Sequence, residues 1–96
     1  MRFKLTSADN LQTYELKSGV TAVVGRAPTS DIPVFDPTIS RRHAELRQEG
    51  ASYWIIDLGS TNGTEVNGKR VKRAKLSEGD TIVLGSTRIT FDRERK

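Results

Sequence analysis

The apolar residues of this chain recur in short alternating runs that are separated by turn-forming residues, and no long helical period is present. Runs spaced about eight to twelve residues apart are typical of a β-sandwich. Near the end, Ile89 and Phe91 alternate with Arg88 and Thr90, so one face of that strand is apolar. The pattern predicts strands at Arg2–Thr6, Gln12–Leu16, Thr21–Val24, Ile32–Val34, His43–Gln48, Ser52–Asp57, Glu65–Val66, Thr81–Leu84 and Arg88–Phe91.

Turn residues separate these runs. Asn67-Gly68 predicts a two-residue hairpin with a type I′ turn, because both residues accept a positive φ. Glu78-Gly79-Asp80 predicts another turn, and Asp36-Pro37 and Ala27-Pro28 indicate loops, since proline lacks a hydrogen-bond donor.

Two other folds fit the pattern less well. Ser40–Gln48 could form a short helix on propensity alone, but only Ala44 and Leu46 would give it an apolar face, and no good C-cap precedes Gly50. A parallel α/β fold needs crossover helices, and no segment is long enough for one. We therefore expect an all-β fold, a β-sandwich of two twisted sheets.

The bulk properties limit the class of protein. The 96 residues suit one domain, which we expect to span 1–96 as a fragment of a larger protein with other domains. The charged residues 92–96 are expected to begin a linker. A net charge of +4 indicates an anionic partner. The chain has no cysteine and opens without an apolar run, so we expect a cytoplasmic protein with no membrane partner.

Four polar clusters lie between the predicted strands, where a sheet protein places its loops. They are Gly25-Arg26, Ser40–His43, Gly59–Thr64 and Val66–Gly68. Together they offer cations, hydroxyls, an amide and freely turning backbone, which can hold a phosphate but are not suited to cleaving one. The guanidinium fork of Arg26 matches phosphate oxygens, although a surface arginine after a turn glycine would look the same.

The single histidine, His43, raises the possibility of an enzyme. A triad with Ser40 is disfavoured because residues three apart on a strand lie on opposite faces, and no nucleophile elbow surrounds the serine. One histidine without clustered carboxylates is also a poor metal site. We therefore expect no enzyme, no metal and no cofactor.

The remaining polar residues admit a structural and a functional interpretation. Arg41 and Arg42 would point to opposite faces if a strand has begun, so only one could face a ligand. Thr61 and Asn62 could simply stabilise their own turn, or they could direct a hydroxyl and an amide at a ligand.

The order and spacing of these clusters resemble the forkhead-associated (FHA) domain, a family of phosphothreonine-peptide readers. The resemblance runs from about Leu16 to Phe91, and the segment Asp36–His43 is similar to bacterial members of the family. It implies an FHA/SMAD-like sandwich of about eleven short strands with the ligand loops at one end. It also implies a non-catalytic module that recognises a phosphothreonine-containing partner protein in Ser/Thr kinase signalling.

The resemblance assigns expected roles to individual residues. It implies that Arg26 and Ser40 bind phosphate oxygens and that Arg41 adds a phosphate or peptide contact. It also implies that Thr61 faces the phosphothreonine and that Asn62 hydrogen-bonds the peptide main chain. It implies that four further residues support the site, with Arg42 facing elsewhere. These supports are Gly25, His43, Gly63 and Asn67.

Ligand preference would come from variable loops, expected at Thr29–Ser30, Pro37–Ile39 and Lys69–Lys75. The basic run in the last of these could attract acidic residues beside the phosphosite or could be a solvated strand face. A phosphate-independent scaffold of the same fold is the main alternative function. Specific nucleic-acid binding is not expected, because few aromatics are available to stack bases and no helix could enter a groove.

Overall fold

The computed structural model of the protein describes residues 3–8 and 12–93, and the regular elements in these ranges are short β-strands. The strands are β1 (Phe3–Ser7), β2 (Thr13–Leu16), β3 (Ala22–Gly25), β4 (Ile32–Pro33), β5 (Ala44–Glu49), β6 (Ser52–Asp57), β7 (Thr64–Val66), β8 (Lys69–Val71), β9 (Arg73–Leu76), β10 (Thr81–Leu84) and β11 (Thr87–Arg93).

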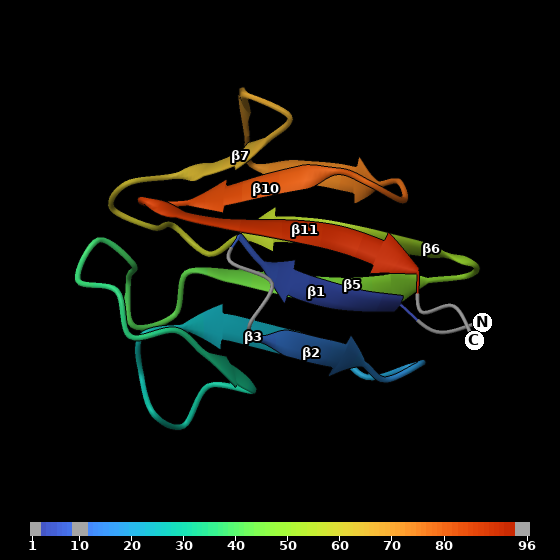
Figure 1. Cartoon of the computed structure of the whole chain (residues 1–96), viewed down its shortest axis with the longest axis horizontal. Helices are drawn as coiled ribbons and strands as arrows, with labels where there is room; N and C mark the ends of the chain where they lie inside the picture. Colours follow the sequence, from blue (N-terminus) through green and yellow to red (C-terminus); the bar gives the residue numbers. More distant parts are fainter. Residues whose placement is uncertain (1–2, 9–11, 94–96) are drawn as a thin grey trace.

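The strands form two sheets packed face to face, as Figure 1 shows. The six-stranded sheet has the order β2-β1-β11-β10-β7-β8, and the five-stranded sheet has the order β4-β3-β5-β6-β9. The pairing of β3 with β4 is parallel, whereas the long central pairs, such as β5 with β6, are antiparallel. The all-β sandwich that the sequence predicted is confirmed.

The core lies between the sheets and follows the predicted alternation. On β6, Tyr53 and Ile55 are buried while Trp54 between them is only partly buried. Three rings join the two sheets, since Phe3 stacks on Phe91 at 4.9 Å between centroids and meets Tyr53 edge-on at 5.2 Å. These contacts hold the sheets together at the end where β1 begins and β11 ends.

The sequence interpretation missed two strands. The segment Lys69–Lys75 was placed among the variable loops, with a solvated strand face as the other interpretation of its basic residues, and it contains β8 and most of β9. Their basic residues hid them, because each strand offers only one or two apolar side chains to a pattern search. Both strands lie at sheet edges, where charged side chains discourage pairing with another chain.

Several predicted boundaries shift. Arg2 lies outside the described residues, and β1 extends to Ser7. Strand β5 begins at Ala44, so the basic cluster before it is loop and the alternation argument for Arg41 and Arg42 does not apply. Strand β11 runs through Arg93, which pairs with Phe3, so a linker does not begin at 92. Residues 94–96 lie outside the described ranges.

The predicted hairpin turn is confirmed. Strands β7 and β8 pair with Val66 opposite Lys69, which leaves two residues in the turn. Both have positive φ, 53° at Asn67 and 84° at Gly68, as a type I′ turn requires.

Three loops gather at one end of the sandwich, on the left in Figure 1. They are the β3–β4 loop (26–31), the β4–β5 loop (34–43) and the β6–β7 loop (58–63). The start of β1 and the end of β11 lie at the opposite end. In the part of the chain that the structure describes, no helix is long and apolar enough to cross a membrane.

Phe91→Ala should lower the free energy of unfolding by about 3–5 kcal/mol, because it removes a fully buried ring and leaves a cavity. Phe91 is only 1% exposed. Phe35, 74% exposed, provides the control, and Phe35→Ala should change the same free energy by less than about 0.5 kcal/mol. Urea unfolding measures both, and equal losses for the two variants would contradict this account of the core.

Candidate functional site

The β3–β4 and β4–β5 loops run side by side and are tied through their backbones. Arg26 N–H donates to the Ser40 carbonyl at 3.0 Å, and Ala27 N–H donates to the Arg41 carbonyl at 3.2 Å. Gly25 makes this approach possible, because a Cβ there would overlap the Arg41 carbonyl. Its φ is not among the positive ones, so close packing explains this glycine.

Ser40 joins the β4–β5 loop to the β6–β7 loop through its hydroxyl. The backbone N–H of Thr61 donates to Ser40 Oγ at 3.0 Å. An N–H can only donate, so the serine oxygen accepts there and its own hydrogen is left to point elsewhere. Ser40 therefore presents a hydrogen-bond donor at the junction of the two loops.

His43 lies beneath this junction, fully buried at 0% exposure. Its Nδ1 accepts from the backbone N–H of Ser40 at 3.2 Å. The hydrogen of the neutral ring therefore sits on Nε2, which donates to the Gly63 carbonyl at 2.8 Å. Both ring nitrogens are occupied by backbone partners, so His43 locks two loops together and has no nitrogen free for proton transfer.

Three arginines surround the junction. Arg26 donates from Nε to the Ile39 carbonyl at 3.0 Å, and its terminal nitrogens have no partner in residues 3–8 and 12–93. Arg41 and Arg42 are exposed, and Arg42 lines a small hollow of about 130 Å³ against the β3–β4 loop. None of the three forms an ion pair with a carboxylate in residues 3–8 and 12–93. This end of the molecule therefore presents uncompensated positive charge.

Asp57 organises the β6–β7 loop from the end of β6. Its carboxylate accepts from the hydroxyls of Ser60 at 2.5 Å and Thr64 at 2.7 Å, and from the backbone N–H groups of Gly59 and Ser60. Burial alone would raise the pKa of Asp57, but these hydrogen bonds hold it below its usual value. The carboxylate is thus an internal anchor for the loop.

Thr61 and Asn62 stand exposed at the tip of this loop. The Asn62 amide donates to the Thr38 carbonyl at 2.7 Å and so spans to the β4–β5 loop. Gly63 follows with φ of 86°, a conformation that L side chains rarely adopt. The tip therefore presents one hydroxyl and one amide beside Ser40.

The sequence interpretation assigned no anchoring role to Asp57, and it also missed a second anchor, Asp36. Its carboxylate accepts from Thr87 Oγ1 at 2.5 Å, from the backbone N–H and hydroxyl of Thr38 at 2.9 and 2.8 Å, and from Ser86 Oγ at 2.8 Å. The hydroxyl of Thr87, then Thr38 and Ser86, lower the pKa of Asp36 far below its ordinary value. Asp36-Pro37 gave only a turn signal, because the partners on β10–β11 are remote in the chain.

Asn67 lies apart from the loop junction. Its side chain donates to Asp80 Oδ1 at 3.0 Å and accepts from the Thr81 N–H at 2.9 Å. It therefore joins the β7–β8 turn to the β9–β10 turn. The structure brings together the other residues expected at the site: Gly25, Arg26, Ser40, Arg41, His43, Thr61, Asn62 and Gly63.

A family model described as the FHA domain matches residues 22–85, which contain all three loops. The chain therefore belongs to the FHA family, whose members bind phosphothreonine peptides. The resemblance read from the sequence is confirmed.

Individual relatives agree with this family. The glycogen accumulation regulator GarA of Mycolicibacterium smegmatis is 48% identical over 71 residues, covering 74% of this chain and 45% of the relative. An oxoglutarate dehydrogenase inhibitor of Corynebacterium jeikeium is also 48% identical over 71 residues, covering 74% of this chain and 49% of the relative. The chain spans about half the length of these curated relatives.

Among solved structures, one comes from a structural and functional analysis of phosphothreonine-dependent FHA domain interactions. It is 34% identical to this chain with a TM-score of 0.91, and the match covers 100% of both chains. The fold is therefore that of a known FHA structure.

His43→Ala should lower the free energy of unfolding by about 2–4 kcal/mol, since it opens a cavity and leaves the Ser40 N–H and Gly63 carbonyl without partners. Arg42→Ala, at the exposed neighbouring position, should change it by less than about 0.5 kcal/mol. Denaturant unfolding of both variants checks the difference. A stable His43→Ala variant would show that the loops do not depend on the ring.

Asp36→Asn should reduce the loss in the free energy of unfolding that occurs as the pH falls into the acid range. The folded-state pKa of Asp36 lies below its ordinary 3.8, so its charge stabilises the fold fully above that value and this contribution is lost as the pH falls below it. Urea unfolding between pH 6 and about pH 2.5 should show a steeper loss in the unmodified protein than in the variant. Parallel curves would contradict the role assigned to this carboxylate.

Proposed function

We propose that the loop junction of this chain binds phosphothreonine, with Arg26, Ser40 and Arg41 holding the phosphate oxygens. The observation that carries the proposal is the arrangement of free donors. Ser40 Oγ already accepts from Thr61 N–H, which leaves its hydrogen for an anion. Arg26 is fixed through Nε, which leaves its terminal nitrogens for the same anion. A phosphoryl group with about two negative charges complements this set.

In this proposal the β6–β7 loop holds the rest of the ligand. Thr61 faces the phosphothreonine, and the Asn62 amide exchanges its Thr38 carbonyl for the peptide main chain or bonds both. Gly25, His43 and Gly63 act indirectly by fixing the loops at their observed spacing. Asn67 is a support only for the neighbouring hairpin.

We further propose that the domain is non-catalytic. The relatives are named as a regulator and an inhibitor, which supports recruitment or regulation rather than chemistry. His43 has no carboxylate partner, because backbone groups occupy both ring nitrogens. In this proposal a Ser/Thr kinase phosphorylates a cytoplasmic partner protein, which the domain then binds. The domain would act as one part of a longer polypeptide.

The alternative is a scaffold of the same fold that binds a partner without phosphate. It predicts that the three loop arginines are dispensable for binding. The absence of ion pairs at Arg26 and Arg41 within the described residues favours the phosphate reader, because a scaffold would have no reason to leave such charge uncompensated.

The test is a titration of a degenerate phosphothreonine peptide pool and its unphosphorylated twin. Arg26→Ala should weaken binding of the phosphorylated pool at least thirtyfold, since losing one partner of a close charge pair costs about 2–5 kcal/mol. Arg26→Lys should also weaken it, because a point charge cannot reproduce the two-donor fork.

Arg47→Ala is the matched control, since it removes the same charge from β5, where Arg47 pairs with Glu45. A pool with glutamate in place of phosphothreonine should bind poorly, because it carries one charge and planar geometry. Equal binding of phosphorylated and unphosphorylated pools would overturn the proposal, and partner capture that survives Arg26→Ala would establish the scaffold instead.

A further inference from the structure

The basic run of residues 69–75 is divided by the fold into two unlike parts. Arg70 lies on β8, at the edge of the six-stranded sheet, whereas Arg73 and Lys75 lie on β9, at the edge of the other sheet. Arg73 is already engaged, with an ion pair to Glu49 at 2.8 Å and its guanidinium 4.5 Å from the Trp54 ring. The run therefore does not act as one uniform positive surface.

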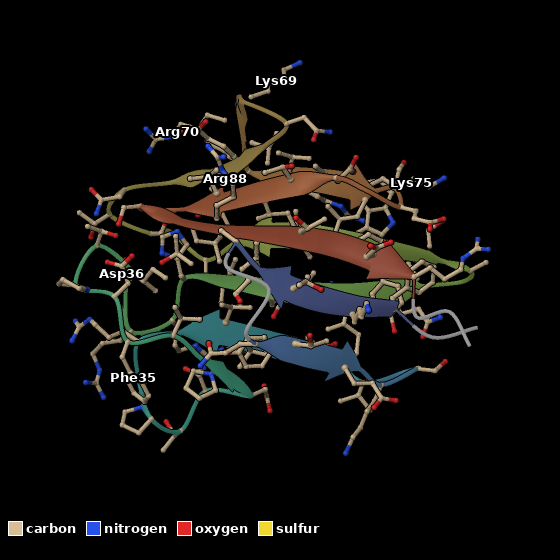
Figure 2. The ribbon with its side chains drawn as sticks, viewed as in Figure 1. Phe35, Asp36, Lys69, Arg70, Lys75 and Arg88 are labelled. Atoms are coloured by element: carbon tan, nitrogen blue, oxygen red, sulfur yellow. The ribbon has the colours of Figure 1, made fainter. Side chains whose placement is uncertain are left out.

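Arg70 lies against the end of the β6–β7 loop. It pairs in register with Glu65 of β7, so both lie on one face together with the diagonal neighbour Gly63. A Cβ on Gly63 would come within 2.6 Å of Arg70 Nε and 2.7 Å of its Cζ. The guanidinium thus lies over the glycine that directly follows Thr61 and Asn62. Figure 2 shows Arg70 toward the loop-bearing side and Lys75 far from it.

Arg70 borders a hollow of about 440 Å³ between the β6–β7 loop and β8. We call it the Arg70 hollow. It is lined by Asp57, Ser60, Gly63, Arg70, Val71 and Lys72.

The charges of the Arg70 hollow favour an anion. The side chains of Arg70 and Lys72 form no hydrogen bond or ion pair with any residue in the described ranges. The carboxylate of Asp57 is turned into its own loop, where four donors surround it. Glu65 stands opposite Arg70 but makes no ion pair with it. Two cations are therefore left without a counterion among the described residues.

We propose that the Arg70 hollow is a second anion subsite that receives an acidic group of the same phosphothreonine ligand. The inference rests on the proposed function, because the loop that ends in Gly63 would hold the ligand through Thr61 and Asn62. A ligand chain held there would lie beside Arg70, because the Arg70 guanidinium lies over Gly63, the residue that follows Asn62. The ligand chemistry is an anionic side chain, either a carboxylate or a second phosphoryl group.

The subsite predicts a ligand preference. Degenerate phosphothreonine pools are prepared with Asp, Asn or phosphoserine fixed at each flanking position in turn, and their affinities are measured by titration. At one flanking position, Asp or phosphoserine should improve affinity over Asn by about fivefold, in the range of a partly exposed charge pair. The gain should shrink at high salt, since exposed charges are screened. Whichever anion gains more identifies the source of the charge.

Arg70→Gln should abolish this preference while leaving the affinity for the Asn pool within about twofold, since a charge-free flank has no pair to lose. Arg70→Lys should retain part of it. Lys75→Gln is the matched control, because it removes the same charge from the same basic run at a site remote from the hollow. Thermal unfolding of each variant verifies that the fold is intact.

The outcomes separate the two proposals. Absence of any phosphopeptide binding by the unmodified protein would overturn the proposed function itself. Binding of all pools with equal affinity would overturn only the subsite. An acidic preference that Lys75→Gln weakens as much as Arg70→Gln would also overturn it, because the effect would then be one of overall charge. Loss of the preference in Arg70→Gln alone establishes the subsite.

Discussion

The loop end of this protein depends on the ring of His43. The imidazole joins the backbone of Ser40 to the carbonyl of Gly63, and it lies fully buried while doing so. A buried ring with both nitrogens satisfied fixes the distance between two loops more firmly than exposed side chains can. The hydroxyl of Ser40 and the tip carrying Thr61 and Asn62 take their positions from that distance.

Two carboxylates complete this frame by accepting hydrogen bonds within the protein. Asp57 folds the β6–β7 loop around itself, and Asp36 ties the β4–β5 loop to the β10–β11 turn. Because their charges are satisfied by hydroxyl and amide donors, neither pairs with the arginines. The two carboxylates therefore stabilise the loops, and the arginines stay available on the surface. A site built this way is organised before the ligand arrives, so less conformational entropy is lost on binding.

The basic side chains differ in whether they have a carboxylate partner. Arg47 and Arg73 pair with glutamates of β5, whereas Arg26, Arg41 and Arg70 stand beside the loops without a carboxylate partner in the described residues. The net charge of the chain therefore does not show which of its cations are free to bind a ligand. What distinguishes the loop end is that its positive groups have been left free next to oriented donors, which is the arrangement a multiply charged anion requires.

Much of the architecture was predictable from the sequence, because period-two alternation at Ile89 and Phe91 or Tyr53 and Ile55 depends only on neighbouring residues. The loop clusters around Arg26 and Ser40 were also visible as local patterns, as was the Asn67-Gly68 turn. Strands β8 and β9 were hidden, because edge strands rich in Lys and Arg lack an apolar period. The Asp36 anchor and the contact of Arg70 with Gly63 join residues remote in the chain or across a sheet. The sequence by itself determined the sandwich and the chemistry of its loops; only the tertiary structure decided which charges are neutralised and which remain free, since that depends on contacts that exist only after the sheets have packed.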